Sequence, residues 1–366
     1  VVNHLNVYGV ANIKEVIEFF NGERELKPTI VNTREEFYKN QENFPYDFAD
    51  VKGQESVKRA LEVAAAGGHN LIMIGAPGSG KSMMAKRLPG ILPPLSLGES
   101  LETTKIHSVA GKLGKDSSLI ATRPFRSPHH TISQVAMVGG GANPQPGEIS
   151  LAHHGVLFLD ELPEFNRSVL EVLRQPLEDR HISISRAKYS LDYPASFMLV
   201  ASMNPCPCGY YNHPTKACVC NPGQVQRYLN RISGPLLDRI DIQIEIVPVP
   251  FEKISEKQQA ESSASIRERV ICARKMQEKR FANHPGVYCN AQMESRLLHL
   301  YAEPDEQGLN LLRNAMTRLN LSARAYDRIL KVARTIADLD HSEQVTSIHL
   351  AEAISYRNLD RESWAG

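Results

Sequence analysis

The sequence carries almost no net charge and no long apolar run. Its 42 lysines and arginines nearly balance its 41 aspartates and glutamates, which leaves a formal net charge of +1. A near-neutral chain has no global electrostatic attraction to nucleic acid or to acidic membranes, so any nucleic-acid site must be a local basic patch. No apolar run approaches the length of about 20 residues that a membrane-spanning helix needs, and we expect no membrane partner.

Cysteine is also scarce, and no secretory-signal pattern is visible. With six cysteines in 366 residues, we expect a protein of the reducing cytoplasm, where clustered cysteines are more often metal ligands than disulfides. The composition is 42% hydrophobic and 23% charged, which is typical of a soluble globular protein with two or three domains. The chain starts at Val1, so we expect a fragment of a longer protein.

The clearest motif is the stretch GAPGSGKS at residues 75–82, which fits the phosphate-binding pattern G-x-x-x-x-G-K-[ST]. The apolar run 71–74 predicts a buried strand before it, and residues 83–88 predict a helix after it. This order places free backbone N–H groups around an anion, with the Lys81 ammonium for the β- and γ-phosphates and the Ser82 hydroxyl for Mg²⁺. A chance glycine turn is the alternative, which the flanking strand and helix disfavour. The residues expected to hold ATP are Gly75, Pro77, Gly78, Ser79, Gly80, Lys81 and Ser82.

Two further apolar runs end in polar residues of the kind that ATP hydrolysis needs. Residues 156–159 lead into Asp160 and Glu161, and residues 197–201 lead to Asn204. In an open α/β sheet, ligands bind at the carboxyl ends of the strands. We therefore expect Asp160 to support Mg²⁺, Glu161 to orient or deprotonate the attacking water, and Asn204 to sense the γ-phosphate.

The remaining patterns predict an α/β domain followed by helices. We expect a lead-in segment at 1–48, an α/β core at 49–250 and a helical domain at 251–366. Further helices are expected at 13–20, 57–67, 169–177, 224–232, 266–281, 325–336 and 347–357. Further strands are expected at 103–109 and 242–247, and a basic hairpin at 181–193.

Two basic segments are candidates for contact with a DNA backbone. One lies within residues 111–150, which show no regular pattern, and an irregular stretch of this length is usually functional. The other is the hairpin. An ordinary surface insertion and a solubilising hairpin are the alternatives. The candidate DNA-binding residues are Arg123, Arg126, His129, His130, Arg186 and Lys188.

Four of the cysteines form two C-x-C pairs, Cys206 with Cys208 and Cys218 with Cys220, separated by nine residues. Four thiolates can close a tetrahedral Zn²⁺ site. Reduced free thiols on a loop are the alternative, but two such pairs joined by a short loop favour zinc.

In the order of its motifs the sequence resembles AAA+ ATPases of the magnesium-chelatase-like family, most closely their bacterial competence-associated branch. The resemblance covers about residues 1–366. The motifs that carry it are GAPGSGKS at 75–82, FRSPHHTIS at 125–133, GEISLAHHGVLFLDELPEF at 147–165, MNPCPCG at 203–209, SGPLLDRID at 233–241 and LSARAYDRILKVARTIADL at 321–339. The resemblance implies an AAA+ P-loop core with a parallel sheet flanked by helices, an all-helical C-terminal lid domain, and a remnant of a Lon-protease-like domain with a linker at 1–48.

The resemblance also implies roles for single residues. These are Lys81 and Ser82 in Walker A, Asp160 and Glu161 in Walker B, Asn204 as sensor 1, Arg239 as an arginine finger that reaches a neighbouring subunit's ATP, and Arg324 as sensor 2 on the lid. A finger that acts on a neighbour requires an oligomer, and a head-to-tail contact that closes makes a ring. A surface salt bridge is the alternative for Arg239, and a helix-face charge is the alternative for Arg324. Arg231 is a candidate for a second contact with the neighbour.

The implied function is an ATP-hydrolysing homo-hexameric ring, a helicase or translocase that promotes branch migration of single-stranded or branched DNA in natural transformation and recombination. The alternative is a protein remodeller or magnesium-chelatase-type ATPase subunit that acts on a protein partner. A nucleotide-binding scaffold without turnover is a third option, which Glu161 and Arg239 disfavour. The basic segments and the cysteine loop favour the DNA motor, whereas the near-zero net charge does not.

Overall fold

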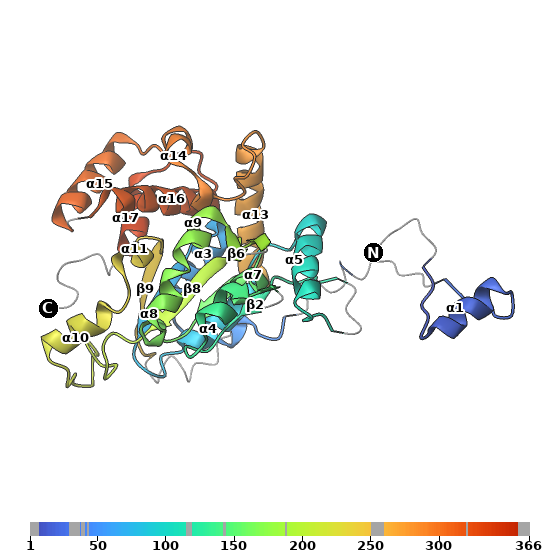
Figure 1. Cartoon of the computed structure of the whole chain (residues 1–366). Helices are drawn as coiled ribbons and strands as arrows, with labels where there is room; N and C mark the ends of the chain where they lie inside the picture. The colour runs from blue at the N-terminus through green and yellow to red at the C-terminus, as the bar shows by residue number, and fades with distance from the viewer. Residues whose placement is uncertain are drawn as a thin grey trace.

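The computed structural model of the chain describes residues 7–28, 37, 41, 44–114, 119–141, 144–186, 189–249, 260–319 and 321–357. Its centre is a five-stranded sheet with the order β2-β5-β8-β1-β9, in which neighbouring strands run parallel (Figure 1). The strands are β1 (Leu71–Gly75), β2 (Phe125–Arg126), β5 (Val156–Leu159), β8 (Met198–Met203) and β9 (Ile242–Ile246). The strands expected at 71–74, 156–159, 197–201 and 242–247 are therefore confirmed, as is the α/β fold class.

The strand expected at 103–109 is wrong, because these residues belong to the helix α5 (Leu97–Val109). A capping box begins this helix. The Ser96 hydroxyl accepts from the Glu99 N–H at 3.2 Å, and the Glu99 carboxylate accepts from the Ser96 N–H at 2.8 Å. Reciprocal caps of this kind stabilise a helix start and outweigh the β propensity of a few residues.

The missing strand comes from the segment that was expected to be irregular. Phe125 pairs with Val156 in parallel register, so β2 forms one edge of the sheet. The Phe125 ring stacks on the Phe158 ring with centroids 5.8 Å apart. Contact of the partly buried Phe125 ring with the buried Phe158 ring holds this short strand in place.

The helices of the α/β part cover both faces of the sheet (Figure 1). They are α3 (Glu55–Gly67), α4 (Lys81–Arg87), α5, α6 (Gln134–Val138), α7 (Glu148–Leu151), α8 (Arg167–Glu171), α9 (Arg174–Asp179), α10 (Pro222–Leu229) and α11 (Gly234–Leu237), with the 3₁₀ turns η1 (Phe48–Asp50), η2 (Leu88–Gly90) and η3 (Leu162–Glu164). The single helix expected at 169–177 is divided into α8 and α9. Pro176 lacks an N–H, and it is tolerated here because it lies in the first turn of α9.

Alternate side chains of β1 enter two different cores. Leu71 and Met73 pack with helices α3, α13 and α16, whereas Ile72 and Ile74 pack on the opposite face with residues of α8 and of the hairpin β6–β7. This alternation follows from the two-residue period of a strand. The sheet is thus buried on both faces, which accounts for the apolar runs in its sequence.

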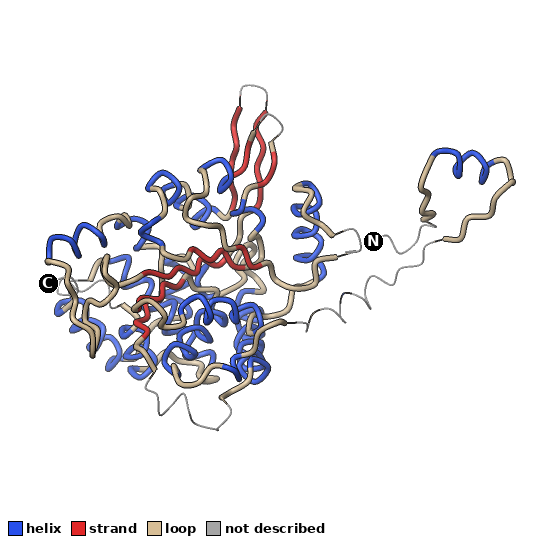
Figure 2. The backbone as a smooth tube through the Cα atoms, turned by 90° about the horizontal axis from the view of Figure 1, so that it is seen from below, coloured by secondary structure: helices blue, strands red, loops and turns tan. Residues whose placement is uncertain are grey.

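Two antiparallel hairpins stand out from the body of the molecule (Figure 2). They are formed by β3 (Gly139–Gly140) with β4 (Gln145–Pro146), and by β6 (His181–Arg186) with β7 (Tyr189–Pro194). The Tyr193 hydroxyl donates to the Pro144 carbonyl at 3.1 Å, so the hairpins lie side by side. The hairpin expected at 181–193 is confirmed.

The C-terminal helices form one packed unit at one end of the sheet. They are α13 (Ser263–Phe281), α14 (Ser295–Tyr301), α15 (Glu306–Arg318), α16 (Ala323–Leu339) and α17 (Ser347–Ser355), with the turn η4 (Asn290–Gln292). Both α13 and α16 pack against α3, and Figure 1 shows the unit at the opposite end of the sheet from α4. The expected all-helical C-terminal domain is therefore confirmed, and its helices bury apolar side chains against α3.

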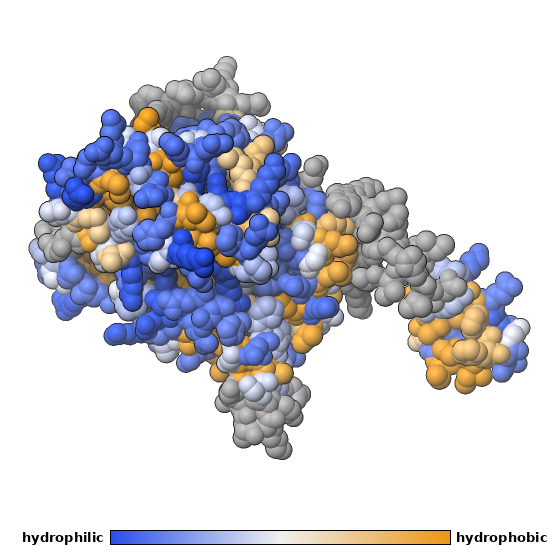
Figure 3. All heavy atoms as spheres, turned by 90° about the horizontal axis from the view of Figure 1, so that it is seen from above, coloured by the Kyte–Doolittle hydropathy of each residue, from blue (hydrophilic) through white to orange (hydrophobic). Residues whose placement is uncertain are grey.

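The helix α1 (Ile13–Phe20), which was expected, lies apart from the other described elements (Figure 1). Its apolar side chains are exposed, with Ile13 at 74% and Phe20 at 81% of full exposure. Figure 3 shows apolar side chains gathered on this segment, in contrast to the mainly hydrophilic face of the body.

A buried network joins the helical unit to the sheet at the amino end of β1. His69 lies between Asp241 and Thr335, with its ring nitrogens 3.2 Å from the Asp241 carboxylate and 2.7 Å from the Thr335 hydroxyl. Arg328 of α16 donates to the same carboxylate at 2.7 Å. Burial raises the pKa of Asp241, but Arg328 and His69 outweigh it and hold this pKa well below its usual range.

We expect Asp241→Asn to lower the free energy of unfolding by about 3 kcal/mol at pH 7, because it removes a buried carboxylate and leaves the half-buried Arg328 guanidinium without its anion. The folded pKa lies below the unfolded value of about 3.9, so the carboxylate stabilises fully above that value and its contribution is lost as the pH falls through the folded pKa. Urea denaturation should therefore show a deficit that is constant above about pH 5 and shrinks in more acidic solution.

The exposed carboxylate of Asp179 provides the matched control. Asp179→Asn should change the free energy of unfolding by less than about 0.5 kcal/mol. A deficit in Asp241→Asn that does not depend on pH would contradict this account of the network.

Candidate nucleotide site

The P-loop follows β1, and its backbone shape depends on glycine. Gly78 and Gly80 have φ angles of 78° and 94°, in a region that strains residues with a side chain. Lys81 begins α4 and folds back over the loop, where its Nζ donates to the carbonyl oxygens of Gly75 at 2.6 Å and Ala76 at 2.9 Å. Burial lowers the pKa of Lys81, and nearby carboxylates oppose that shift. The ammonium thus lies in the hollow where phosphates would bind.

The carboxyl ends of β5 and β8 bring three more polar groups to this hollow. Lys81 Nζ donates to Asn204 Oδ1 at 3.2 Å, and Ser82 Oγ donates to Asp160 Oδ2 at 2.6 Å. Ser202 also donates its hydroxyl to Asp160. Hydroxyl and carboxylate oxygens are ligands that Mg²⁺ accepts, so Ser82 and Asp160 fit a magnesium site. Sequence reasoning missed Ser202, although its position two residues before Asn204 could have indicated that its side chain lies near the same site.

Glu161 lies at the rim of the hollow and is exposed. Its φ of 55° is left-handed, and its N–H donates to the Asp160 carboxylate at 3.1 Å. His130 Nδ1 lies 3.7 Å from the Glu161 carboxylate, and the His130 ring stacks near that of His129, with centroids 4.0 Å apart. The structure thus brings part of the expected DNA-binding segment to the edge of the nucleotide site, a contact that the sequence did not predict.

Arg239 lies at the opposite end of the sheet, where the amino ends of the strands are. Its carbonyl accepts from Asn70 Nδ2 at 2.9 Å, and Asn70 directly precedes β1. Because five strand residues span about 16 Å, Arg239 is far from the P-loop of its own chain. Its guanidinium is largely buried and forms an ion pair with Glu178 of α9.

Arg324 lies at this same amino edge. Its side chain is 72% exposed and donates to the Asp238 carboxylate at 2.9 Å. Asp238 directly precedes Arg239 in the chain. The role of Arg324 as sensor 2 stays a prediction. Arg231 pairs with Glu164 at 2.9 Å on the surface.

Two of the expected DNA-binding arginines are paired within the chain. Arg123 is half-buried and donates to Glu99 at 3.2 Å, and Arg126 pairs with Glu148 at 2.7 Å. Such pairs neutralise the positive charge that a phosphate would need. Lys188 and the side chain of Arg186 lie outside the described residues, so their role stays a prediction.

The four cysteines expected to bind zinc lie close together near the carboxyl ends of the parallel strands. The Sγ atom of Cys206 lies 3.3 Å from that of Cys208 and 3.7 Å from that of Cys218, and the last two are 3.5 Å apart. Cys220 completes a group whose ligand atoms all lie within 4.8 Å of one another. Tetrahedral Zn–S bonds of about 2.3 Å place sulfurs about 3.8 Å apart, so the cluster fits zinc.

Backbone groups favour a thiolate in this cluster. Burial raises the pKa of Cys208, but the N–H groups of Tyr210 and Val219 and the neighbouring thiols outweigh it and lower this pKa, while the pKa values of Cys218 and Cys220 are raised by the same cluster. Hydrogen bonds from backbone N–H groups to sulfur stabilise the charged form that a metal requires.

A second polar cluster, Glu102 with His153 and His154, does not fit a metal. His153 Nδ1 accepts from the Ser196 N–H at 3.0 Å. The neutral ring must then carry its proton on Nε2, which faces Glu102 at 3.3 Å. Burial lowers the pKa of His153 to about 4, so the ring stays neutral. A nitrogen that carries a proton has no lone pair for a metal.

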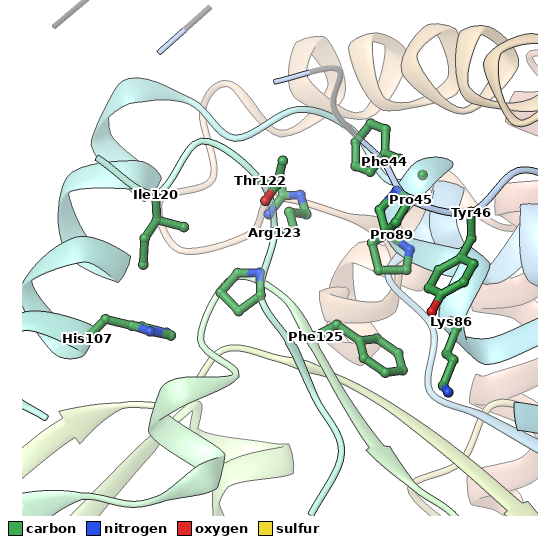
Figure 4. Close-up of a pocket in the computed structure, with 12 residues that line it drawn as sticks. Phe44, Pro45, Tyr46, Lys86, Pro89, His107, Ile120, Thr122, Arg123 and Phe125 are labelled. Carbon is green, nitrogen blue, oxygen red and sulfur yellow. The ribbon is translucent and has the colours of Figure 1, made fainter. Parts of the chain in front are cut away.

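A cavity of about 390 Å³ lies beside β2, between residues 44–46, the end of α4 and residues 120–125 (Figure 4). Phe44, Tyr46, Ile120 and Phe125 contribute much of its apolar lining. Residues 75–82, Asp160 and Asn204 do not line it. The cavity is therefore separate from the nucleotide site.

Comparison with known proteins identifies two family regions. Residues 47–254 match the magnesium chelatase subunit ChlI, and residues 260–357 match the C-terminal region of that subunit. These boundaries agree with the α/β part and the helical unit. None of the described helices is long and apolar enough to cross a membrane.

Three relatives match most of this chain. An uncharacterized protein YifB of Escherichia coli is 47% identical over 96% of this chain and 67% of its own length. The competence protein ComM of Haemophilus influenzae is 43% identical over 98% of this chain and 69% of its own length. An uncharacterized protein YifB of Salmonella typhimurium is 49% identical over 86% of this chain and 61% of its own length. The chain thus spans about two thirds of the length of these relatives, and the resemblance to this branch of the family is confirmed.

The contact between Ser82 and Asp160 predicts how Mg²⁺ contributes to nucleotide binding. Ser82→Ala should weaken the Mg²⁺-dependent part of ATP binding by about 10- to 100-fold, a typical effect at metal sites. Binding without Mg²⁺ should be unchanged, because Lys81 and the backbone N–H groups remain. Titration of a fluorescent ATP analogue with and without Mg²⁺ measures both parts.

Ser108 of α5 is an exposed serine and serves as the control. Ser108→Ala should bind as the unmodified chain does. Equal Mg²⁺ dependence in Ser82→Ala and in Ser108→Ala would show that the Ser82 hydroxyl is not a ligand.

Proposed function

The chain belongs to the magnesium chelatase family of AAA+ ATPases, and we propose that it hydrolyses ATP to drive a ring-shaped motor on DNA. One observation carries the ATP-hydrolysis part of the proposal. The oxygens of Ser82 and Asp160 meet at 2.6 Å, beside Lys81 and Asn204. Paired metal-ligating oxygens, an ammonium and an amide at the ends of neighbouring parallel strands suit hydrolysis of a γ-phosphate.

Each group has a chemical task in this proposal. The P-loop N–H groups bind the phosphates, and the Lys81 ammonium turns from the loop carbonyls to the γ-phosphate. Mg²⁺, when bound at Ser82 and Asp160, neutralises charge on the β- and γ-phosphates. Glu161 accepts a proton from the attacking water, and the Asn204 amide holds that water in line with the bond that breaks.

A second subunit completes the site. Arg239 lies about 16 Å, the length of β1, from its own P-loop, so it serves the ATP of a neighbour. Such an arginine stabilises charge that develops on the γ-phosphate. A head-to-tail contact between the two edges of the sheet closes into a ring, for which we propose six copies. Arg324 lies on the same side as Arg239 and serves the same neighbouring site.

The substrate of the motor is single-stranded or branched DNA. The two adjacent hairpins extend from the body, as elements that line a ring and grip a phosphate backbone would (Figure 2). The relative from Haemophilus influenzae is named a competence protein, which supports a role in natural transformation and recombination. His129 and His130, with Arg186 and Lys188, are the DNA contacts that we retain.

A protein remodeller or a chelatase-type subunit is the second candidate. The ion pairs of Arg123 and Arg126 favour it, because they leave little free positive charge on the segment at 123–130. The family match to a chelatase subunit favours it as well. Both candidates use the same ATPase residues, so only the response to DNA separates them.

Zinc is the metal that we propose for Cys206, Cys208, Cys218 and Cys220. All four thiols are free in this structure, and four sulfur ligands at these distances are typical of a closed structural site. Thiolates remain available in a reducing compartment, so we propose the cytoplasm as the location.

DNA should increase the rate of ATP hydrolysis if the chain is a DNA motor. The assay compares turnover with no DNA, with single-stranded DNA and with branched DNA. Lys81→Ala should abolish turnover, and Glu161→Gln should reduce it about 10²- to 10⁴-fold because the general base is lost. If DNA leaves the rate unchanged and no DNA binding is detected at low salt, the motor is wrong and the remodeller is favoured.

Mixing two inactive variants tests whether Arg239 acts on a neighbour. Arg239→Ala alone should lose about 10³-fold or more in turnover, and Lys81→Ala alone should be inactive. Their mixture should recover part of the activity, because some interfaces combine an intact P-loop with an intact Arg239.

Mixing Lys81→Ala with Glu161→Gln is the matched control. Both changes lie in the same half of the site, so no interface is whole and no activity should return. Absence of recovery in the first mixture, with mixed assembly confirmed by light scattering and pull-down, would refute action on a neighbour.

A further inference from the structure

The cysteine loop, residues 204–221, begins at the edge of the sheet where the P-loop lies. Met203 at the end of β8 pairs with Ile74 of β1, so the P-loop and the cysteine loop leave the sheet side by side. The first residue of the loop, Asn204, accepts a hydrogen bond from Lys81 at 3.2 Å. Only Pro205 separates Asn204 from the first cysteine.

The loop also packs directly on the middle of the P-loop. A Cβ atom on Gly209 would lie 2.5 Å from Cδ and 2.8 Å from Cγ of Pro77, which is closer than carbon atoms approach. Gly209 also has a φ of 84°, which side-chain residues rarely adopt. The backbone at Gly209 is thus fitted against the ring of Pro77.

Few residues of the loop are buried. It contains no helix or strand between β8 and α10, and its buried residues are Pro205, Cys206 and Gly209. Val219 is 83% exposed. Without an apolar core, the convergence of four sulfurs is the main feature that joins the two ends of the loop, and a metal cross-link takes the place of a core in such small segments.

We propose that the metal held by the four cysteines fixes Gly209 against Pro77, so that metal and nucleotide bind cooperatively. The proposal rests on the ATP site and the zinc site assigned above. A metal-bound loop keeps Asn204 and the P-loop in the shape that accepts phosphates. A metal-free loop leaves Pro77 without support and weakens nucleotide binding.

Thermodynamic reciprocity makes this testable without measuring turnover. If zinc raises the affinity for nucleotide by some factor, nucleotide must raise the affinity for zinc by the same factor. Coupling between sites is typically about 5- to 150-fold. ADP should therefore slow the loss of zinc, and removal of zinc should weaken ADP binding by a similar factor.

The experiment uses the purified chain loaded with Zn²⁺, with ADP as the nucleotide and no Mg²⁺. Metal analysis first gives the zinc content, which should be about one per chain for one Cys₄ site. Transfer of zinc to a chromogenic chelator is then followed with and without ADP, and ADP affinity is measured for loaded and metal-free chains. ADP should slow zinc transfer several-fold.

Three variants localise the effect. Lys81→Ala should hold zinc but lose protection by ADP, because nucleotide no longer binds. Gly209→Ala should hold zinc with reduced protection, since its Cβ forces the loop away from Pro77. Cys272→Ser changes an exposed cysteine outside the cluster and should behave as the unmodified chain.

The outcomes separate this inference from the proposed function. Zinc far below one per chain contradicts both the zinc site and the coupling. A loaded chain that binds ADP but releases zinc at the same rate with and without it overturns the coupling and leaves the ATPase proposal standing. A loaded chain that binds no ADP contradicts the ATPase proposal and the coupling together.

Discussion

The parallel register of three adjacent strands determines where the candidate catalytic groups lie. β5, β8 and β1 run in the same direction and are buried on both faces. Their carboxyl ends therefore open at one edge of the sheet, where Asp160, Asn204 and Lys81 meet. Rigid buried strands hold polar groups with the accuracy that phosphoryl transfer requires. The cysteine loop leaves from the same end of the sheet, which explains how the four cysteines lie close to the P-loop.

The amino end of the sheet is where the helical unit is joined to the core. There His69 and Asp241 join the helical unit to the core through hydrogen bonds to Thr335 and Arg328. Arg239 lies two residues before Asp241, and its carbonyl accepts a hydrogen bond from Asn70, so its backbone is held beside that buried network. One end of the sheet thus carries the P-loop, and the other carries the arginine that we propose acts on a neighbouring subunit. Two unlike edges on one rigid sheet are what a head-to-tail ring requires.

Patterns within single elements were sufficient to predict much of this site from the sequence. The P-loop, Asp160 and Asn204 follow from apolar runs and glycine spacing, and the cysteine cluster follows from two close pairs. The errors arose where distant contacts decide the structure. Residues 103–109 are helical because of a cap at Ser96, which lies before the stretch in question. The partners of Arg123 and Arg239, and the packing of the C-terminal helices on α3, depend on residues far away in the chain, which no local pattern reveals.

We propose that one chain carries only half of a working ATP site. The most direct test is the turnover per chain as a function of protein concentration, with the assembly state followed by light scattering at each concentration. The account predicts that turnover per chain is near zero for the monomer, rises as chains assemble, and reaches a plateau when the rings are complete. A turnover per chain that stays constant down to concentrations where the protein is monomeric would contradict it.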